Sequence, residues 1–131
     1  APIAAKQLQG SDRLATRDQM LTELSQLMQG TGSPVEIAQK WQKLEVLDVF
    51  HWLSLWVCDL DRMKSSGGLV ANQDPKVGKI LKFTASKAND ASIFDLTDYI
   101  LSVRSGLQSQ QNLNTQLVLE KILIRWHDLV I

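Results

Sequence analysis

The chain has 131 residues, of which 44% are hydrophobic and 21% charged, with 14 basic and 14 acidic side chains. This composition excludes a disordered polyelectrolyte, and the balanced charge argues against a protein dedicated to binding phosphate backbones. The length suits a single domain that buries roughly two thirds of the surface its unfolded form would expose.

Apolar residues recur with helical spacing along the whole chain, and no run of alternating β-branched residues interrupts them. This pattern predicts an all-α fold. Residues 2–9 are predicted to end one helix, with Gly10 as its stop and Ser11 as the cap of the next helix. The apolar side chains of that next helix share one face, which predicts packing on one core: Leu14, Met20, Leu21, Leu24, Leu27 and Met28.

The run Ser33-Pro34-Val35-Glu36 predicts a helix start, because it places serine at the cap, proline at the first helical position and glutamate three residues after the cap. The short helix that follows leads into the most apolar segment of the chain, which ends before Gly67. Its broad apolar arc predicts the centre of a helical bundle: Val46, Val49, Phe50, Trp52, Leu53, Trp56, Val57, Leu60 and Met63, with Leu47 and Leu55 beyond the arc.

Two more helices are predicted before the C-terminal segment. One begins at Pro75 and ends before Asn89. The other is predicted to begin with the capping-box-like run at residues 92–95 and to continue to a polar joint at residues 108–112. In all, we expect a bundle of about five to six main helices.

The last helix, in residues 112–131, has two apolar faces. The broad arc consists of Val118, Leu119, Ile122, Leu123, Trp126, Leu129 and Val130, and the narrow stripe of Leu113, Leu117, Ile124 and Ile131. Polar residues separate the two faces, with Glu120 on one boundary and Lys121 and Asp128 on the other. Periodicity alone leaves two interpretations open: a central helix buried on both sides, or a helix shared between a core and a partner.

No catalytic, cofactor-binding or metal-binding motif is predicted. The glycine pair at residues 67–68 is not followed by the lysine and hydroxyl residue of a phosphate loop. His51 and Cys58 lie seven residues apart on one helical face, but two ligands do not make a metal site, and a mid-helix thiol is a poor nucleophile. We interpret both as structural residues, and the four tryptophans as core residues.

The cellular compartment can be inferred from the cysteine count and from the absence of a membrane-spanning or signal segment. Cys58 is the single cysteine and cannot form an internal disulfide, which favours the reducing cytoplasm. Charged residues interrupt the longest apolar run well before the ~20 residues of a membrane span, and no signal-peptide pattern begins the chain. We therefore expect a cytoplasmic protein without membrane contact.

Several strings resemble the C-terminal domain of the delta-prime subunit of the bacterial DNA polymerase III clamp loader. The most specific is the run from Asn114 to Trp126, with its leucine-rich centre and closing Arg-Trp pair. The run from His51 to Arg62, followed by a glycine-containing loop and a restart at Pro75, is similar to the family in order and spacing. Residues 1–5 resemble the segment that closes the lid of that subunit's nucleotide-binding module.

The resemblance implies that residues 1–10 are the end of the preceding lid region and that residues 11–131 form a helical collar domain for oligomerisation. Collars of several subunits pack side by side in such clamp loaders, and the collar has no catalysis of its own. The implied partners are clamp-loader subunits of the gamma/tau and delta type, with no cofactor, direct nucleic-acid contact, membrane or small-molecule substrate. The implied subunit-interface candidates are Leu113, Leu117, Glu120, Ile124 and Ile131.

Two alternatives remain at this point. The first is a free-standing helical adaptor or regulatory domain that binds one partner helix in a groove. An enzyme acting through His51 is the third interpretation, which the absence of a recognisable catalytic constellation disfavours. If the collar interpretation holds, the narrow stripe must be more exposed in the isolated domain than Leu119, Ile122, Leu123 and Trp126.

Overall fold

The computed structural model describes residues 2–65, 75–108 and 114–130, and the side chains of residues 13–65, 75–106 and 114–130. These residues form six helices and, within the described ranges, no strand, which confirms the predicted all-α bundle. The helices are α1 (Pro2–Met28), α2 (Pro34–Trp41), α3 (Val46–Ser65), α4 (Pro75–Lys87), α5 (Asp90–Gln108) and α6 (Thr115–Leu129).

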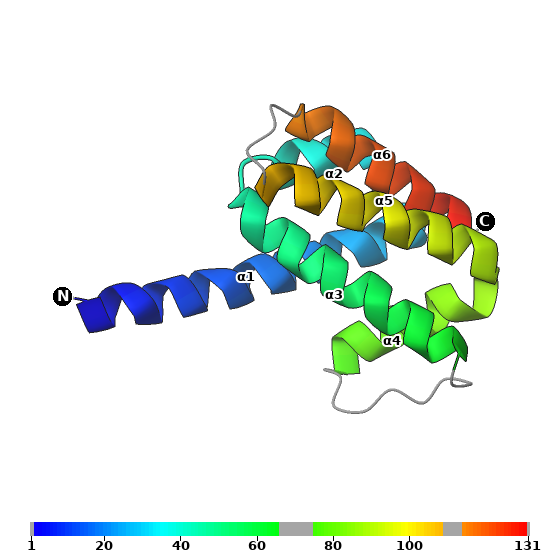
Figure 1. The fold of residues 1–131 in the computed structure, drawn as a ribbon, viewed down its shortest axis with the longest axis horizontal. Helices are drawn as coiled ribbons and strands as arrows, with labels where there is room; N and C mark the ends of the chain where they lie inside the picture. Colours follow the sequence, from blue (N-terminus) through cyan, green and yellow to red (C-terminus); the bar gives the residue numbers. More distant parts are fainter. Residues whose placement is uncertain (1, 66–74, 109–113, 131) are drawn as a thin grey trace.

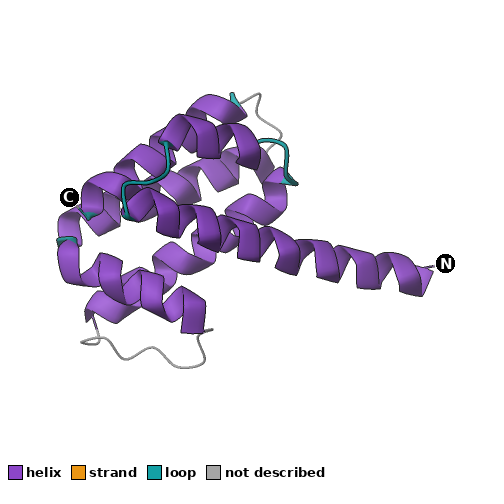
Figure 2. Ribbon diagram, turned by 180° about the vertical axis from the view of Figure 1, so that it is seen from behind, coloured by secondary structure: helices purple, strands orange, loops and turns teal. Residues whose placement is uncertain are grey.

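The bundle is built around α3, which contributes eight buried residues to the core and packs against α1, α4 and α5. Helix α6 lies on the other side of α5 and also packs against α2 (Figure 1). The C-terminal half of α1 crosses the bundle behind α3, as the reverse view makes plain (Figure 2). The predicted central position of the longest apolar segment is therefore confirmed.

Helix α1 is continuous from Pro2 to Met28, so the predicted stop at Gly10 and cap at Ser11 are wrong. A single glycine inside a helix costs only about 1 kcal/mol relative to alanine. The alanine, glutamine and leucine residues on both sides favour helix and offset that cost. The first half of α1 projects away from the bundle (Figure 1), and Leu14, predicted to face the core, is 50% exposed.

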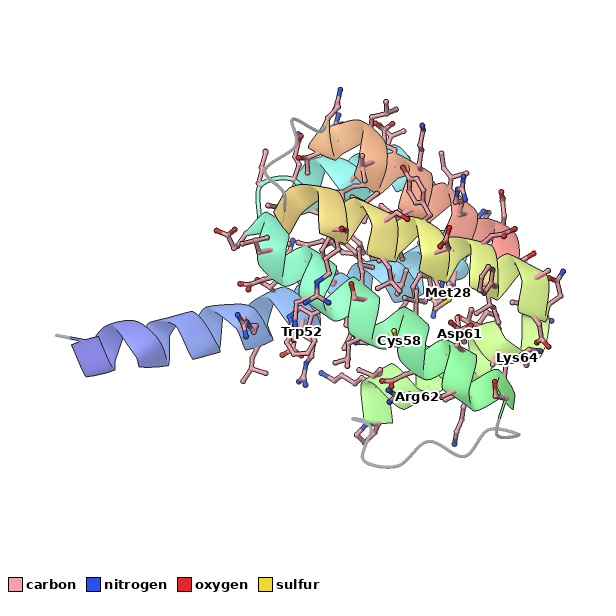
Figure 3. All side chains as sticks on the ribbon, in the orientation of Figure 1. Met28, Trp52, Cys58, Asp61, Arg62 and Lys64 are labelled. Atoms are coloured by element: carbon pink, nitrogen blue, oxygen red, sulfur yellow. The ribbon has the colours of Figure 1, made fainter. Side chains whose placement is uncertain are left out.

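Trp52 on α3 contacts α1 at the point where that helix leaves the bundle (Figure 3). Its indole Nε1 donates a 3.1 Å hydrogen bond to the carbonyl oxygen of Arg13, and the guanidinium of Arg17 lies 5.8 Å from its ring centroid. The side chain of Arg13 forms a 3.2 Å ion pair with Asp48 at the start of α3. These contacts fix the direction in which α1 projects.

The helix starts are only partly as predicted. Ser33 is the N-cap of α2 with Pro34 at the first helical position, but its side chain makes no capping hydrogen bond. Helix α5 begins at Asp90 and not at residue 92, because Asn89 Oδ1 accepts a 2.8 Å hydrogen bond from the amide of Ser92. Asn114 caps α6 in the same way, accepting from the amide of Leu117 at 3.1 Å.

Helices α1 and α2 are joined by a turn that depends on glycine. Gly30 has a φ of 83°, the left-handed conformation that terminates many helices and that side chains disfavour. Helix α1 accordingly ends at Met28, two residues before Gly30. Among the described residues, no helix is long and apolar enough to cross a bilayer.

Candidate subunit interface on helix α6

The broad apolar arc of α6 is embedded in the core. Four of its side chains are 0% exposed, namely Leu119, Ile122, Leu123 and Trp126. The indole Nε1 of Trp126 also donates a 3.3 Å hydrogen bond to Thr84 Oγ1 on α4. A buried indole N–H needs a partner, and this contact provides one while joining α6 to α4 in the core.

The narrow stripe of α6 faces away from that core. Leu117 is 49% exposed and Ile124 is 45% exposed, so the predicted contrast with the buried arc is confirmed for these two residues. Leu113 and Ile131 lie outside the residues whose side chains the structure describes. At Leu117 and Ile124, therefore, the described part of the chain does not bury α6 on both sides.

Charged residues share this exposed face. Lys121 lies one turn after Leu117, and Asp128 lies one turn after Ile124; both are exposed. Both lie at the boundary predicted from helical periodicity, next to the stripe, and the structure leaves them exposed along with it. The surface is therefore mixed. The aliphatic side chains of Leu117 and Ile124 alternate along it with the charged side chains of Lys121 and Asp128.

The start of α2 borders the stripe on one side. Gln116 Nε2 lies 3.2 Å from Glu120 Oε2 and 3.4 Å from the carbonyl oxygen of Val35, which links α6 to α2. Glu120 is half-buried, and Val35 is 44% exposed. The structure thus places Glu120 at the edge of the stripe, where its carboxylate holds Gln116, and it adds Val35 to the apolar surface.

Helix α5 borders the stripe on the other side. The guanidinium of Arg125 lies 4.6 Å from the centroid of the Tyr99 ring, a cation–π contact that joins α6 to α5. A hollow of about 170 Å³ next to it is lined by Ser92, Asp95, Leu96, Arg125, Asp128 and Leu129.

Sequence reasoning missed Phe94, which is 66% exposed on α5. The available signal was its position directly after the buried Ile93, which puts it off the face that carries Leu96 and Ile100. Phe94 and Leu101, the latter 40% exposed, form a further apolar surface on the outer face of α5, away from the face that Leu96 and Tyr99 turn toward α6.

No group of three His, Cys, Asp or Glu side chains in the described part of the chain is placed to hold a metal ion. Burial lowers the pKa of His51 below its ordinary value of 6.5, helped by the positive charges of Arg13 and Arg104 and opposed by Asp48. Its ring packs edge-on against Trp52, with centroids 4.9 Å apart. Cys58 is a partly buried free thiol. These contacts fit the structural roles expected for both residues.

The sequence model of the family described as "DNA polymerase III, delta subunit, C terminal" matches residues 11–128. This range includes the last 18 residues of α1 and nearly all of α6, so it spans both the core and the exposed stripe. Neither the curated proteins nor the solved structures gave a match.

Proposed function

Since this chain belongs to the family of C-terminal domains of the DNA polymerase III delta subunit, a clamp-loader family, we propose that it is a non-catalytic oligomerisation domain of a clamp loader. In this proposal it acts as a collar, packing beside the collars of gamma/tau and delta type subunits and so holding the loading assembly together. The observation that carries the proposal is the half-exposed pair Leu117 and Ile124, on the side of α6 opposite its buried arc.

The finer assignment, to the delta-prime subunit, is also part of the proposal. It rests on the resemblance of residues 51–62 and 114–126, which fall in the centre of the bundle and in the two-faced helix. Residues 1–10 would then end the preceding lid region. The family match beginning at residue 11 and the projection of α1 away from the bundle both support an attachment through this helix.

The chemistry of the stripe suits a contact between subunits. Complete burial of a leucine or isoleucine contributes about 1.5–3 kcal/mol, so covering the exposed half of Leu117 and Ile124 would contribute about 1 kcal/mol each. Lys121 and Asp128 would fix the register of the neighbour, because a misplaced charge pair costs more than it contributes when correctly paired. Val35 would extend the contact onto α2.

The proposal assigns no reaction, cofactor, membrane contact or direct nucleic-acid contact to this domain, and it places the protein in the cytoplasm. The balanced charge supports the absence of a phosphate-backbone role. Family membership favours the clamp-loader role over the free-standing adaptor.

The test is assembly of the full-length protein with Leu117→Asp and Ile124→Asp. We expect it to remain folded by circular dichroism and to fail to co-purify with its clamp-loader partners. A matched control replaces Leu47 and Leu55, which are 55% and 44% exposed on α3, with aspartate. Assembly of the α6 variant at the level of this control would refute the assignment of the interface to α6.

A further inference from the structure

A groove separates the C-terminal half of α1 from α4 and has a volume of about 550 Å³. Its apolar lining comes from both helices: Leu21 and Met28 on α1, and Ile80 and Phe83 on α4. Thr84 Oγ1 on α4 lies 3.4 Å from the sulfur of Met28 on α1, a residue labelled in Figure 3, while its hydroxyl proton is directed to the carbonyl oxygen of Ile80 at 2.9 Å. The groove is large enough to hold several side chains of a binding partner.

Phe83 gives this groove an accessible apolar wall. Its side chain is 42% exposed, although the neighbouring Ile80 and Leu81 are buried in the core. Aromatic rings that line a groove are frequent anchor points in protein interfaces, because they provide a large contact area with few rotatable bonds. Across the groove, the polar side chains of Thr22, Ser25, Gln26 and Gln29 form the α1 rim.

The charge of the groove has one sign. Lys76 and Lys79 line it, and none of its lining residues is acidic. The whole of α4 carries four lysines and no acidic residue, in a chain whose basic and acidic residues balance. A ligand that buries apolar groups against Phe83 would therefore gain from carboxylates placed next to Lys79.

We propose that the groove between α1 and α4 docks an acidic amphipathic segment of a partner protein, with apolar side chains inserted between the helices and carboxylates facing the lysines. Two lining lysines around an apolar floor are too few for a nucleic-acid track, which combines many cations with stacking rings. An acidic amphipathic segment suits both parts of the groove, because its apolar side chains match the apolar floor and its carboxylates match the lysines.

This surface is separate from the proposed subunit interface. None of the groove residues belongs to α6, and the exposed stripe of α6 faces away from the core in which Trp126 meets Thr84 of α4. An acidic segment could thus bind while neighbouring subunits cover the stripe of α6. The groove would add a second, independent partner to the domain.

The experiment uses two fluorescein-labelled peptides of roughly 16 residues, long enough to form a marginal helix. One carries leucines and a phenylalanine on one helical face and glutamates elsewhere, and its twin has lysine in place of each glutamate. Fluorescence anisotropy with the full-length protein should detect binding of the glutamate peptide at least tenfold tighter than binding of its twin. Phe83→Ser and Lys79→Glu should each weaken the glutamate peptide at least fivefold.

Lys82→Glu is the matched control, because Lys82 is exposed on the same helix but does not line the groove. It should change affinity less than twofold, and the α6 variant Leu117→Asp/Ile124→Asp should bind the glutamate peptide normally. No binding of the glutamate peptide, equal binding of both peptides, or equal losses for Lys79→Glu and Lys82→Glu would each overturn the proposal. Displacement of the bound peptide by single-stranded DNA would overturn it in favour of a nucleic-acid groove.

Discussion

The indole Nε1 of Trp41 on α2 donates a 2.9 Å hydrogen bond to Glu23 Oε1 on α1, in the interior of the bundle. Glu23 is 6% exposed, and Lys40 Nζ lies 3.4 Å from its second carboxylate oxygen. A buried carboxylate is costly unless its oxygens are paired, and here each oxygen has a partner. This arrangement holds α2, and through it one side of α6, against α1.

Glu23→Ala should therefore destabilise the domain by about 2–4 kcal/mol, because it leaves the Trp41 N–H without an acceptor and opens a cavity. Glu23→Gln keeps an acceptor for the indole and should cost about 1 kcal/mol or less. Urea unfolding followed by tryptophan fluorescence measures both values. Equal losses for the two substitutions would mean that the hydrogen bond from Trp41 contributes nothing.

The burial of Glu23 could not be predicted from the sequence. Glutamate is almost never fully buried unless it is paired, so its position on α1 gave no sign of its burial. The partner lies 18 residues away on another helix, and only the packing of α1 against α2 brings the two side chains together. By contrast, the buried arc and exposed stripe of α6 could be predicted, since both follow from helical periodicity within one element.

The other differences between sequence and structure have the same origin. Leu14 lies in the periodic pattern of α1, but the helix leaves the bundle there and no core remains to cover it. The groove lined by Phe83 depends on the angle between α1 and α4, which neither helix encodes alone. At Gly10 the error is local. Glycine predicts a helix stop there, but its helix-favouring neighbours continue the helix through it.

Gly30 provides a second stability prediction. Its φ of 83° lies in the left-handed region, and a Cβ added there would meet no atom within 4 Å, so backbone strain alone sets the cost. Gly30→Ala should destabilise the domain by about 1–2 kcal/mol, and Gly30→Asn by less, because asparagine tolerates this conformation better. Thermal unfolding by circular dichroism would rank the three proteins. A ranking with alanine above asparagine would contradict the explanation.

His51 should make stability depend on pH. Burial, with Arg13 and Arg104, lowers its folded-state pKa below the ordinary value of 6.5, so the unfolded chain takes up a proton at a higher pH than the folded chain does. The stability that this histidine supports is present above pH 6.5 and is lost as the pH falls from 6.5 through the folded-state pKa. Urea midpoints measured from pH 7.5 to 5 should fall less steeply in His51→Gln than in the wild type. Identical slopes would exclude a role for His51.

A matched pair of truncations, Leu117→Ala and Leu123→Ala, distinguishes the roles of the two faces of α6 in stability and in assembly. Leu123 is 0% exposed, so its truncation should cost the isolated domain about 2–5 kcal/mol through lost burial and a residual cavity. Leu117 is 49% exposed, and its truncation should cost about 1 kcal/mol or less.

Assembly should give a different pattern. In the full-length protein at a temperature where both variants are folded, Leu117→Ala should weaken association with clamp-loader partners about fivefold or more, because the methyl groups it removes would be covered by the neighbour. Leu123→Ala should leave the association constant of the folded protein nearly unchanged, since Leu123 makes its contacts inside the domain. Sedimentation or surface-plasmon measurements with purified partners provide the constants. If the two substitutions weakened assembly equally once folding was accounted for, the exposed stripe would have no special part in the contact.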